Sequence, residues 1–177
     1  LEFRRVLFRS NMADFPEAGE DLIAMGVGTV EQREGPNLYP DFLLNVTVPY
    51  VSNEQCLADD WYDNLPLPFS DYMLCAGGVE GKGNCNGDSG SPLVKRTYLG
   101  DGKFHDVHVG VVSFGSTVCG GPKAPGVYGR TSTAYEWIRD VVCDDFNLNA
   151  KFCKCQDEVI KIKKKEDGCK NYVGEEK

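Results

Sequence analysis

Gly83-Asn84-Cys85-Asn86-Gly87-Asp88-Ser89-Gly90-Ser91-Pro92 is the stretch of the chain that decides the fold. Glycines stand on both sides of Ser89, and glycine adopts positive φ angles at little steric cost. We therefore expect a tight turn that exposes the Ser89 hydroxyl. In such a turn the amides of Gly87 and Ser89 point to one place, which is the arrangement that binds the oxyanion of an acyl-transfer intermediate.

The same stretch resembles the nucleophile loop of the chymotrypsin/trypsin-like serine proteases (peptidase S1), whose usual form is Gly-Asp-Ser-Gly-Gly-Pro. Ser91 replaces the second of the paired glycines. Other segments of that family follow in the family's order, namely Met73 to Gly77, Val111 to Gly115, Pro125 to Tyr128 and a terminal helix with Trp137 and Ile138. The resemblance runs from about residue 22 to residue 142.

The resemblance implies an all-β fold, a Greek-key antiparallel β-barrel equivalent to the second barrel of the trypsin-like fold, with a C-terminal helix and a Cys-rich tail. The residue pattern agrees, because many short strands with Gly-rich turns indicate such a barrel. Residues 42–51 alternate as a strand with Leu44, Val46 and Val48 on one face. An Asp101-Gly102 pair between two strand patterns predicts a hairpin.

Two capping boxes predict where helices begin. Ser52 with Gln55 precedes a short helix, and Thr133 with Glu136 precedes the terminal helix. The second helix is expected to carry an apolar stripe. This stripe consists of Ala134, Trp137, Ile138, Val141 and Val142.

Length, charge and cysteine content set the broad class. A chain of 177 residues suits one domain, and its net charge of −8 disfavours binding to nucleic acid or an anionic membrane. No apolar run is long enough to span a bilayer. Eight cysteines favour an oxidising compartment, so we expect a secreted protein.

Three regions are predicted along the chain. Residues 1–10 look like translated adapter sequence and are set aside from the fold. Residues 11–142 form the C-terminal part of a trypsin-like protease domain, and residues 143–177 form a Cys-rich and Lys-rich tail of unknown role. Because the resemblance starts with the second barrel, we expect the first, N-terminal barrel to be missing.

For the cysteines, the resemblance implies two disulfides, Cys56–Cys75 and Cys85–Cys119. A third bridge of the family would join the positions of Leu22 and Lys95, where both cysteines are absent. In the tail, Cys143 and Cys169 are expected to pair with Cys153 and Cys155, one each. A zinc site in the tail is the alternative, although the spacing does not favour it. We expect no metal and no other cofactor.

The resemblance makes Ser89 the nucleophile and Gly87 and Ser89 the oxyanion hole. A serine also needs a base, usually a histidine held by an acid. In this family both precede the serine, yet the two histidines here, His105 and His108, follow it. One of them could serve in another order, but truncation explains the pattern better. The counterpart of Asp88 orders the loop by pairing with a new N-terminal ammonium.

The resemblance also places the substrate-binding residues. Gly83 is at the base of the primary pocket and Gly115 and Gly126 are its walls, so the pocket should be open and uncharged. Residues 113–115 would pair with the substrate backbone, with Ser113 first and Phe114 as an aromatic wall. We expect a protein or peptide substrate with a large apolar side chain at P1, the residue on the acyl side of the cut.

The function predicted from these features is serine-type endopeptidase activity of chymotrypsin-like primary specificity, present here as a fragment without the catalytic His and Asp. The alternative is a non-catalytic homologue that acts as a protein-binding or inhibitor-like module. Separately, Asn45-Val46-Thr47 is a glycosylation sequon. An unmodified, outward-facing polar pair explains Asn45 and Thr47 equally well.

Overall fold

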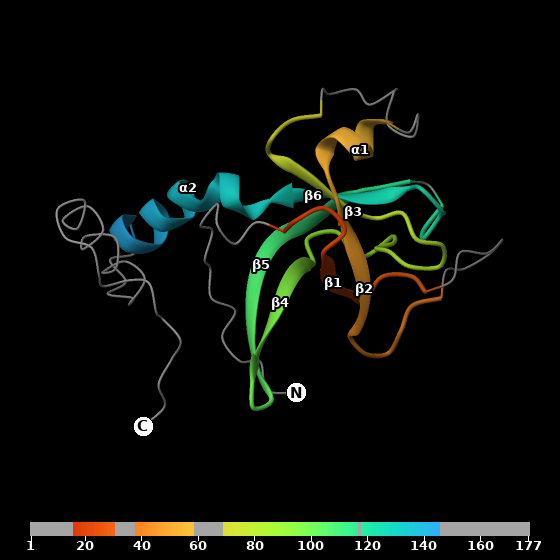
Figure 1. Cartoon of the computed structure of the whole chain (residues 1–177), viewed down its shortest axis with the longest axis horizontal. Coiled ribbons are helices and arrows are strands. Elements are labelled where there is room, and N and C mark those ends of the chain that lie inside the picture. Colours follow the sequence, from red (N-terminus) through yellow and green to blue (C-terminus); the bar gives the residue numbers. More distant parts are fainter. Residues whose placement is uncertain (1–15, 31–37, 59–68, 117, 146–177) are drawn as a thin grey trace. The chain divides into compact units, whose positions relative to one another are not determined.

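The computed structural model describes residues 16–30, 38–58, 69–116 and 118–145. The chain divides into two compact units, Leu1–Ala134 and Tyr135–Lys177. The first unit contains a closed antiparallel barrel with the strand order β1-β2-β3-β6-β5-β4 (Figure 1). The predicted all-β barrel is therefore confirmed.

The strand expected over residues 42–51 and the two strands expected around Asp101-Gly102 are among the strands of the barrel. The strands are β1 (Asp21–Gly26), β2 (Leu44–Val51), β3 (Met73–Gly77), β4 (Pro92–Gly100), β5 (Lys103–Phe114) and β6 (Pro125–Arg130). The helical segments are α1 (Asn53–Ala58), the 3₁₀-helix η3 (Thr131–Ala134), α2 (Tyr135–Asp140) and the π-helix η4 (Val141–Asp145).

The barrel closes where β1 pairs with β4 as well as with β2. Leu22 of β1 lies directly opposite Lys95 of β4 in this register. These are the two positions that the resemblance assigns to a missing disulfide. Their pairing supports the alignment on which the other residue assignments depend.

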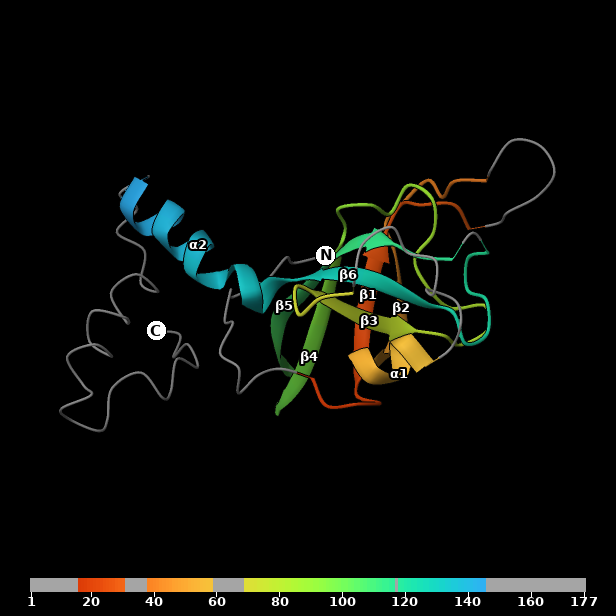
Figure 2. The same cartoon turned by 90° about the horizontal axis from the view of Figure 1, so that it is seen from above.

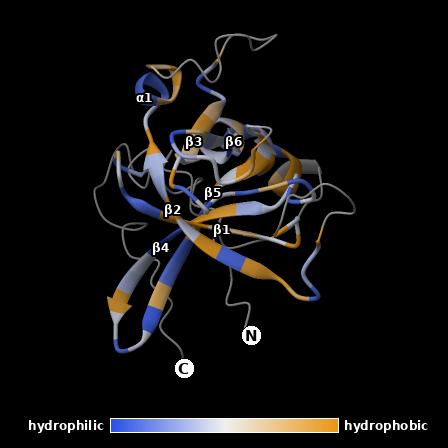
Figure 3. Ribbon diagram, turned by 90° about the vertical axis from the view of Figure 1, so that its right-hand side faces the viewer, coloured by the Kyte–Doolittle hydropathy of each residue, from blue (hydrophilic) through white to orange (hydrophobic). Residues whose placement is uncertain are grey.

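Apolar side chains that alternate along the strands fill the barrel. Figure 3 shows hydrophobic and hydrophilic residues following one another in bands along the strands. In β2, Val48 and Tyr50 are buried and Val46 packs against them, while Asn45 and Thr47 are exposed. The buried cluster consists of Leu22, Ala24, Val48, Tyr50, Leu74, Ala76, Leu93, Val107, Val109, Val112 and Tyr128.

The helix α1 begins with the predicted capping box. The Gln55 amide donates to Ser52 Oγ at 3.2 Å, and the Ser52 amide donates back to Gln55 Oε1 at 3.3 Å. The Cys56–Cys75 disulfide joins α1 to β3, which lies beside it in Figure 2. Both cysteines are buried with Val127 in a second, smaller apolar cluster.

The strands β4 and β5 form a long hairpin, drawn in green in Figure 1. Its turn is the predicted Asp101-Gly102 pair, with φ angles of 51° and 73°. Positive φ at both central residues matches the right-handed twist of the strands that leave the turn. The hairpin prediction is confirmed.

The end of the described chain differs from the single capped helix that the sequence predicts. It consists of the three short segments η3, α2 and η4. The Thr133 hydroxyl donates to the Arg130 carbonyl at 2.8 Å, and no described hydrogen bond joins it to Glu136. The second capping box is therefore not formed. Within the described ranges, no helix has the length and apolar character needed to cross a membrane.

Candidate active site

Two amides of the turn that carries Ser89 have no hydrogen-bond partner among the described residues. Gly87 and Gly90 have φ angles of 98° and 85°, as a tight turn requires. The amide of Asp88 donates to the Cys85 carbonyl, and the amide of Gly90 donates to Val112 of β5. Among the described residues, none accepts a hydrogen bond from the Gly87 or Ser89 amide. Ser89 itself is exposed.

The carboxylate of Asp88 is held by amides from two segments. Gly28 donates to Oδ1 at 2.7 Å, and Cys85 donates to Oδ2 at 2.8 Å. A Cβ atom at Gly26 or Gly28 would overlap the Asp88 carboxylate. The two glycines therefore make room for the Asp88 side chain.

Thr29 also holds the turn that carries Ser89, although no sequence motif points to it. Its amide donates to the Asn86 carbonyl at 2.9 Å, and its hydroxyl donates to Cys85 Sγ at 2.8 Å. Thr29 is 6% exposed, so these bonds are shielded from water. Together with the Asp88 bonds, they fix the segment after β1 against the turn that carries Ser89.

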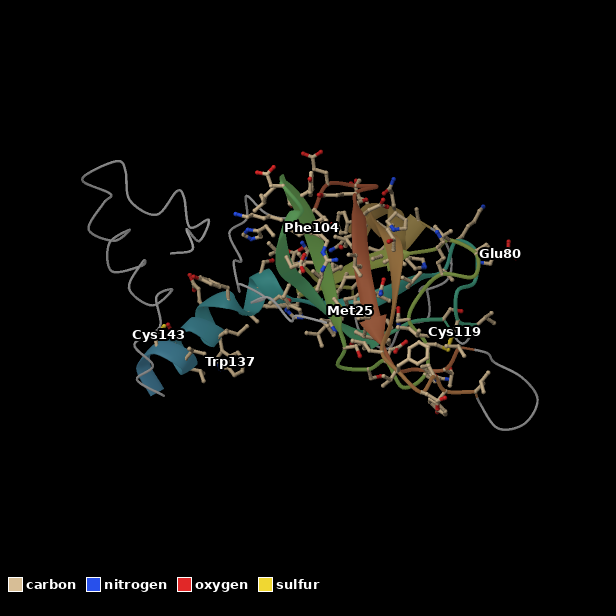
Figure 4. The ribbon with its side chains drawn as sticks, turned by 90° about the horizontal axis from the view of Figure 1, so that it is seen from below. Met25, Glu80, Phe104, Cys119, Trp137 and Cys143 are labelled. Carbon is tan, nitrogen blue, oxygen red and sulfur yellow. A yellow bond between two sulfur atoms is a disulfide. The ribbon has the colours of Figure 1, made fainter. Side chains whose placement is uncertain are left out.

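The Cys85–Cys119 disulfide is formed as the resemblance implies. It lies beside a hollow of about 350 Å³. Gly83 and Asp88 also line this hollow, and so do Met25 and Cys119, which are labelled in Figure 4. The predicted base of the primary pocket and the predicted loop-ordering carboxylate therefore share one space.

The predicted pocket walls, Gly115 and Gly126, face each other. The Cβ position of Gly115 is 3.7 Å from Gly126 Cα. The amide side chain of Asn84 lies against both glycines, and a Cβ on Gly126 would overlap its Oδ1 atom. The Tyr128 hydroxyl donates to Oδ1 at 3.1 Å. The space beside the walls is thus polar and partly filled by a residue that the sequence did not single out.

Gly83 faces a different neighbour from the other two pocket glycines. Its Cβ position is 3.6 Å from the Gly120 amide nitrogen, in the hollow beside the disulfide. On β5, a register shift separates Val112 from Phe114, so Ser113 lies at a β-bulge. Pairing of β5 with β4 ends at Val111, and the exposed residues Ser113 and Gly115 lie beyond it.

The two histidines both lie on β5, and neither has a described hydrogen bond to Ser89. His108 Nδ1 forms a 3.1 Å hydrogen bond with the Thr131 hydroxyl. Burial lowers the pKa of His108 below its ordinary value, because desolvation disfavours the imidazolium ion.

Cys143 is the tail cysteine that lies within the described residues. Cys143 is disulfide-bonded, whereas Cys153, Cys155 and Cys169 lie outside the described residues. In the part of the chain that the structure covers, no three His, Cys, Asp or Glu side chains gather as metal ligands would.

Relatives of known identity share both sequence and fold with this chain. The trypsin family model matches residues 6–138. Glucanase inhibitor protein 3 of Phytophthora infestans is 43% identical over 131 residues, which cover 71% of this chain and 46% of that protein. The submandibular glandular kallikrein-3 of Rattus norvegicus is 36% identical over 128 residues, covering 72% of this chain and 60% of the kallikrein.

A solved structure of a serine protease also resembles this chain. Neuropsin, a serine protease expressed in the limbic system of mouse brain, superposes with a TM-score of 0.60 at 29% identity. The match covers 78% of this chain and 54% of neuropsin. This chain thus spans about half the length of the relatives it matches. The family model covers most of the chain and the barrel has the matching fold, so the chain belongs to the trypsin family of serine proteases, peptidase S1.

Proposed function

We propose that this chain is the serine-bearing part of a secreted serine endopeptidase. The observation that carries the proposal is the pair of amides at Gly87 and Ser89 that have no partner in the described part of the chain, beside the exposed Ser89 hydroxyl. The amides of Asp88, Gly90 and Ser91 in the same turn are all engaged. Two free donors next to a nucleophile are what a tetrahedral acyl intermediate requires for its oxyanion.

In the proposed mechanism, the Ser89 hydroxyl attacks the scissile carbonyl and the Gly87 and Ser89 amides bind the resulting oxyanion. Asp88 orders the turn, because its carboxylate connects the turn to Gly28. The histidine and aspartate that activate the serine would come from the N-terminal barrel of the same protease. This chain alone is therefore expected to show little or no hydrolysis.

We further propose a preference for a large apolar side chain at P1. The pocket residues Gly83, Gly115 and Gly126 and the Asn84 amide that lies against the two walls carry no charge, and the Asp88 carboxylate beside Gly83 is already bonded to two amides. Among the described residues that line the hollow at Gly83, no other carboxylate is present to pair with a P1 arginine or lysine. The exposed edge at Ser113 and Gly115, beyond the end of β4 pairing, suits an added substrate strand.

The test uses the full-length protein that contains this chain, as wild type, Ser89→Ala and Ser91→Ala. A fluorophosphonate probe should label the wild type and Ser91→Ala but not Ser89→Ala. Loss of the nucleophile should lower kcat/KM by at least about 1,000-fold. Peptides with Phe, Tyr or Leu at P1 should be cut faster than matched peptides with Arg. Equal labelling of Ser89→Ala and wild type would contradict the nucleophile assignment.

A second candidate is a protein-binding, inhibitor-like module. It is favoured by the 43% identity to glucanase inhibitor protein 3, compared with 36% to the kallikrein. If this candidate is right, the full-length protein should bind a glucanase equally well as wild type and as Ser89→Ala, and it should resist the fluorophosphonate probe. Probe labelling together with no glucanase binding would reject the inhibitor-like module and support the protease function.

A further inference from the structure

A single sequon in the chain lies on the outer face of the barrel. Asn45-Val46-Thr47 is the only Asn-x-Ser/Thr triplet among the 177 residues. In β2, Val46 packs against the barrel core and Val48 is buried. Asn45 and Thr47 are the alternate residues, and both are exposed. The fold thus leaves both polar side chains of the sequon in solvent, where a bulky modification does not disturb packing.

The residues just before the sequon form an exposed apolar stripe, consisting of Phe42, Leu43 and Leu44. Their exposed fractions are 69%, 45% and 36%. Three consecutive exposed apolar side chains are unfavourable on a secreted protein unless something covers them. Asn45 directly follows the stripe, and it also lines the hollow that contains Asp88.

We propose that Asn45 carries an N-linked oligosaccharide, and that this glycan covers the apolar stripe and stands at the rim of the Asp88 hollow. The inference rests on the proposed secretion of the protein and not on the proposed hydrolysis. Both described disulfides of the barrel need an oxidising compartment, and in the secretory pathway that is also where sequons are modified.

The modification is a group transfer from a lipid-linked oligosaccharide pyrophosphate. Asn45 Nδ2 forms a bond to C1 of the first sugar while the bond from C1 to the pyrophosphate oxygen breaks. The lipid pyrophosphate leaves, and Nδ2 gives up one proton to solvent. No oxidant or reductant is consumed, and the donor is the single co-reactant.

The test expresses the full chain behind a cleavable secretion signal, both in cultured eukaryotic cells and in cell-free translation with microsomes. The intact mass should exceed the mass of the polypeptide, and peptide:N-glycosidase F should remove the excess and convert Asn45 to aspartate. Asn45→Gln and Thr47→Ala should abolish the excess, whereas Thr47→Ser should keep it. Thr97→Ala, which removes an exposed strand threonine elsewhere, is the matched control and should keep it too.

The microsome assay detects glycosylation of Asn45 even in a variant that fails to fold. An unmodified wild-type chain in the microsomal lumen would overturn the proposal, and so would a glycan that persists in Thr47→Ala. Covering of the stripe has its own measurement, because a dye that fluoresces on apolar surfaces should brighten after enzymatic deglycosylation. Unchanged fluorescence would refute the covering. A glycosylated protein that fails to hydrolyse peptides would retain this inference while rejecting the protease function.

Discussion

Asp88 joins two parts of the site through hydrogen bonds to single backbone amides. One of them, from Gly28, spans 60 residues of sequence. The space for the carboxylate exists because Gly26 and Gly28 lack side chains. The hydrogen bonds that hold the Ser89 turn therefore depend on two glycines, one in β1 and one just after it, whose lack of side chains leaves room for Asp88.

Gly26→Ala should therefore loosen the Ser89 turn. The new methyl group would overlap the Asp88 carboxylate and force it away from the Gly28 and Cys85 amides. We expect a loss of about 1–3 kcal/mol in the free energy of unfolding, as is typical of overpacking. Thermal unfolding measures this loss, and hydrogen exchange at Gly28 and Cys85 should accelerate.

Gly129→Ala is the matched control for that change. It introduces the same methyl group into β6, where the nearest atom is the Val111 carbonyl oxygen at 3.9 Å. Its stability should stay close to that of the wild type. Equal destabilisation by both alanines would show that the Asp88 contact is not the cause.

His108 should make stability depend on pH near neutrality. Its pKa is lowered in the folded state by burial, so the unfolded chain binds a proton more readily. The free energy of unfolding should therefore fall as pH drops below the ordinary histidine pKa of about 6.5. His108→Gln should flatten this dependence in urea unfolding between about pH 7.5 and about pH 5.5.

At the scale of elements, Arg130 connects the end of β6 to β3 and to α1 by hydrogen bonds. Its guanidinium donates to the Met73 carbonyl of β3 at 2.9 Å through Nη2 and at 3.1 Å through Nε. Nη2 also donates to Asn53 Oδ1 of α1 at 3.2 Å. A planar group with several donors is needed to reach both acceptors at once.

Arg130→Ala should lower the free energy of unfolding by about 1–3 kcal/mol, since part-buried acceptors lose a charged donor. Arg130→Lys should restore little of the lost stability, because a single ammonium group does not reproduce the forked donors of a guanidinium group. Arg96→Ala provides the comparison, since Arg96 forms an exposed ion pair with Asp106 at 2.6 Å. Arg96→Ala should lower the free energy of unfolding by less than about 1 kcal/mol. Urea unfolding of the three variants tests this order.

The same scale shows why strands were predicted better than the terminal helix. Alternating apolar residues and the Asp101-Gly102 turn are local signals, and the barrel confirmed them. The Thr133 capping box is also a local signal, but the hydroxyl bonds to the Arg130 carbonyl instead. Arg130 is fixed by β3 through a contact 57 residues away, which a short sequence window does not contain.

At the scale of the whole molecule, two disulfides connect distant segments of the barrel unit. Cys85–Cys119 joins residues 34 apart, and Cys56–Cys75 joins residues 19 apart. If stabilisation comes from restricting the unfolded chain, the two contribute about 4 and about 3 kcal/mol. Both values are large compared with the total stability of a domain this size.

Replacing Cys85 and Cys119 together by alanine should lower stability slightly more than replacing Cys56 and Cys75 together. Only the first replacement should also speed hydrogen exchange at residues 87–91, because Cys85 belongs to the Ser89 turn. Urea unfolding and exchange monitored by mass spectrometry check both points. Faster exchange of this turn after loss of Cys56–Cys75 would contradict the assignment.

The molecular scale also explains which site residues escaped prediction. Ser89, Asp88 and the glycines stand in a motif that the sequence displays. Asn84 lies in the same motif, but its role comes from Tyr128, 44 residues away. Thr29 likewise acts through Cys85, 56 residues away. Side-chain contacts at such separations depend on the closed barrel, so they were visible only in the structure.

The bond between Gly28 and Asp88 also has a consequence for the order of folding. The β4–β5 hairpin is local and should form early, whereas β1 reaches β4 only after a long loop has closed. The carboxylate finds its partner at Gly28 only once β1 is in place. In pulse-labelled refolding, the Gly28 and Cys85 amides should therefore gain protection after the hairpin. The turn that carries Ser89 would be among the last parts of the barrel to become rigid.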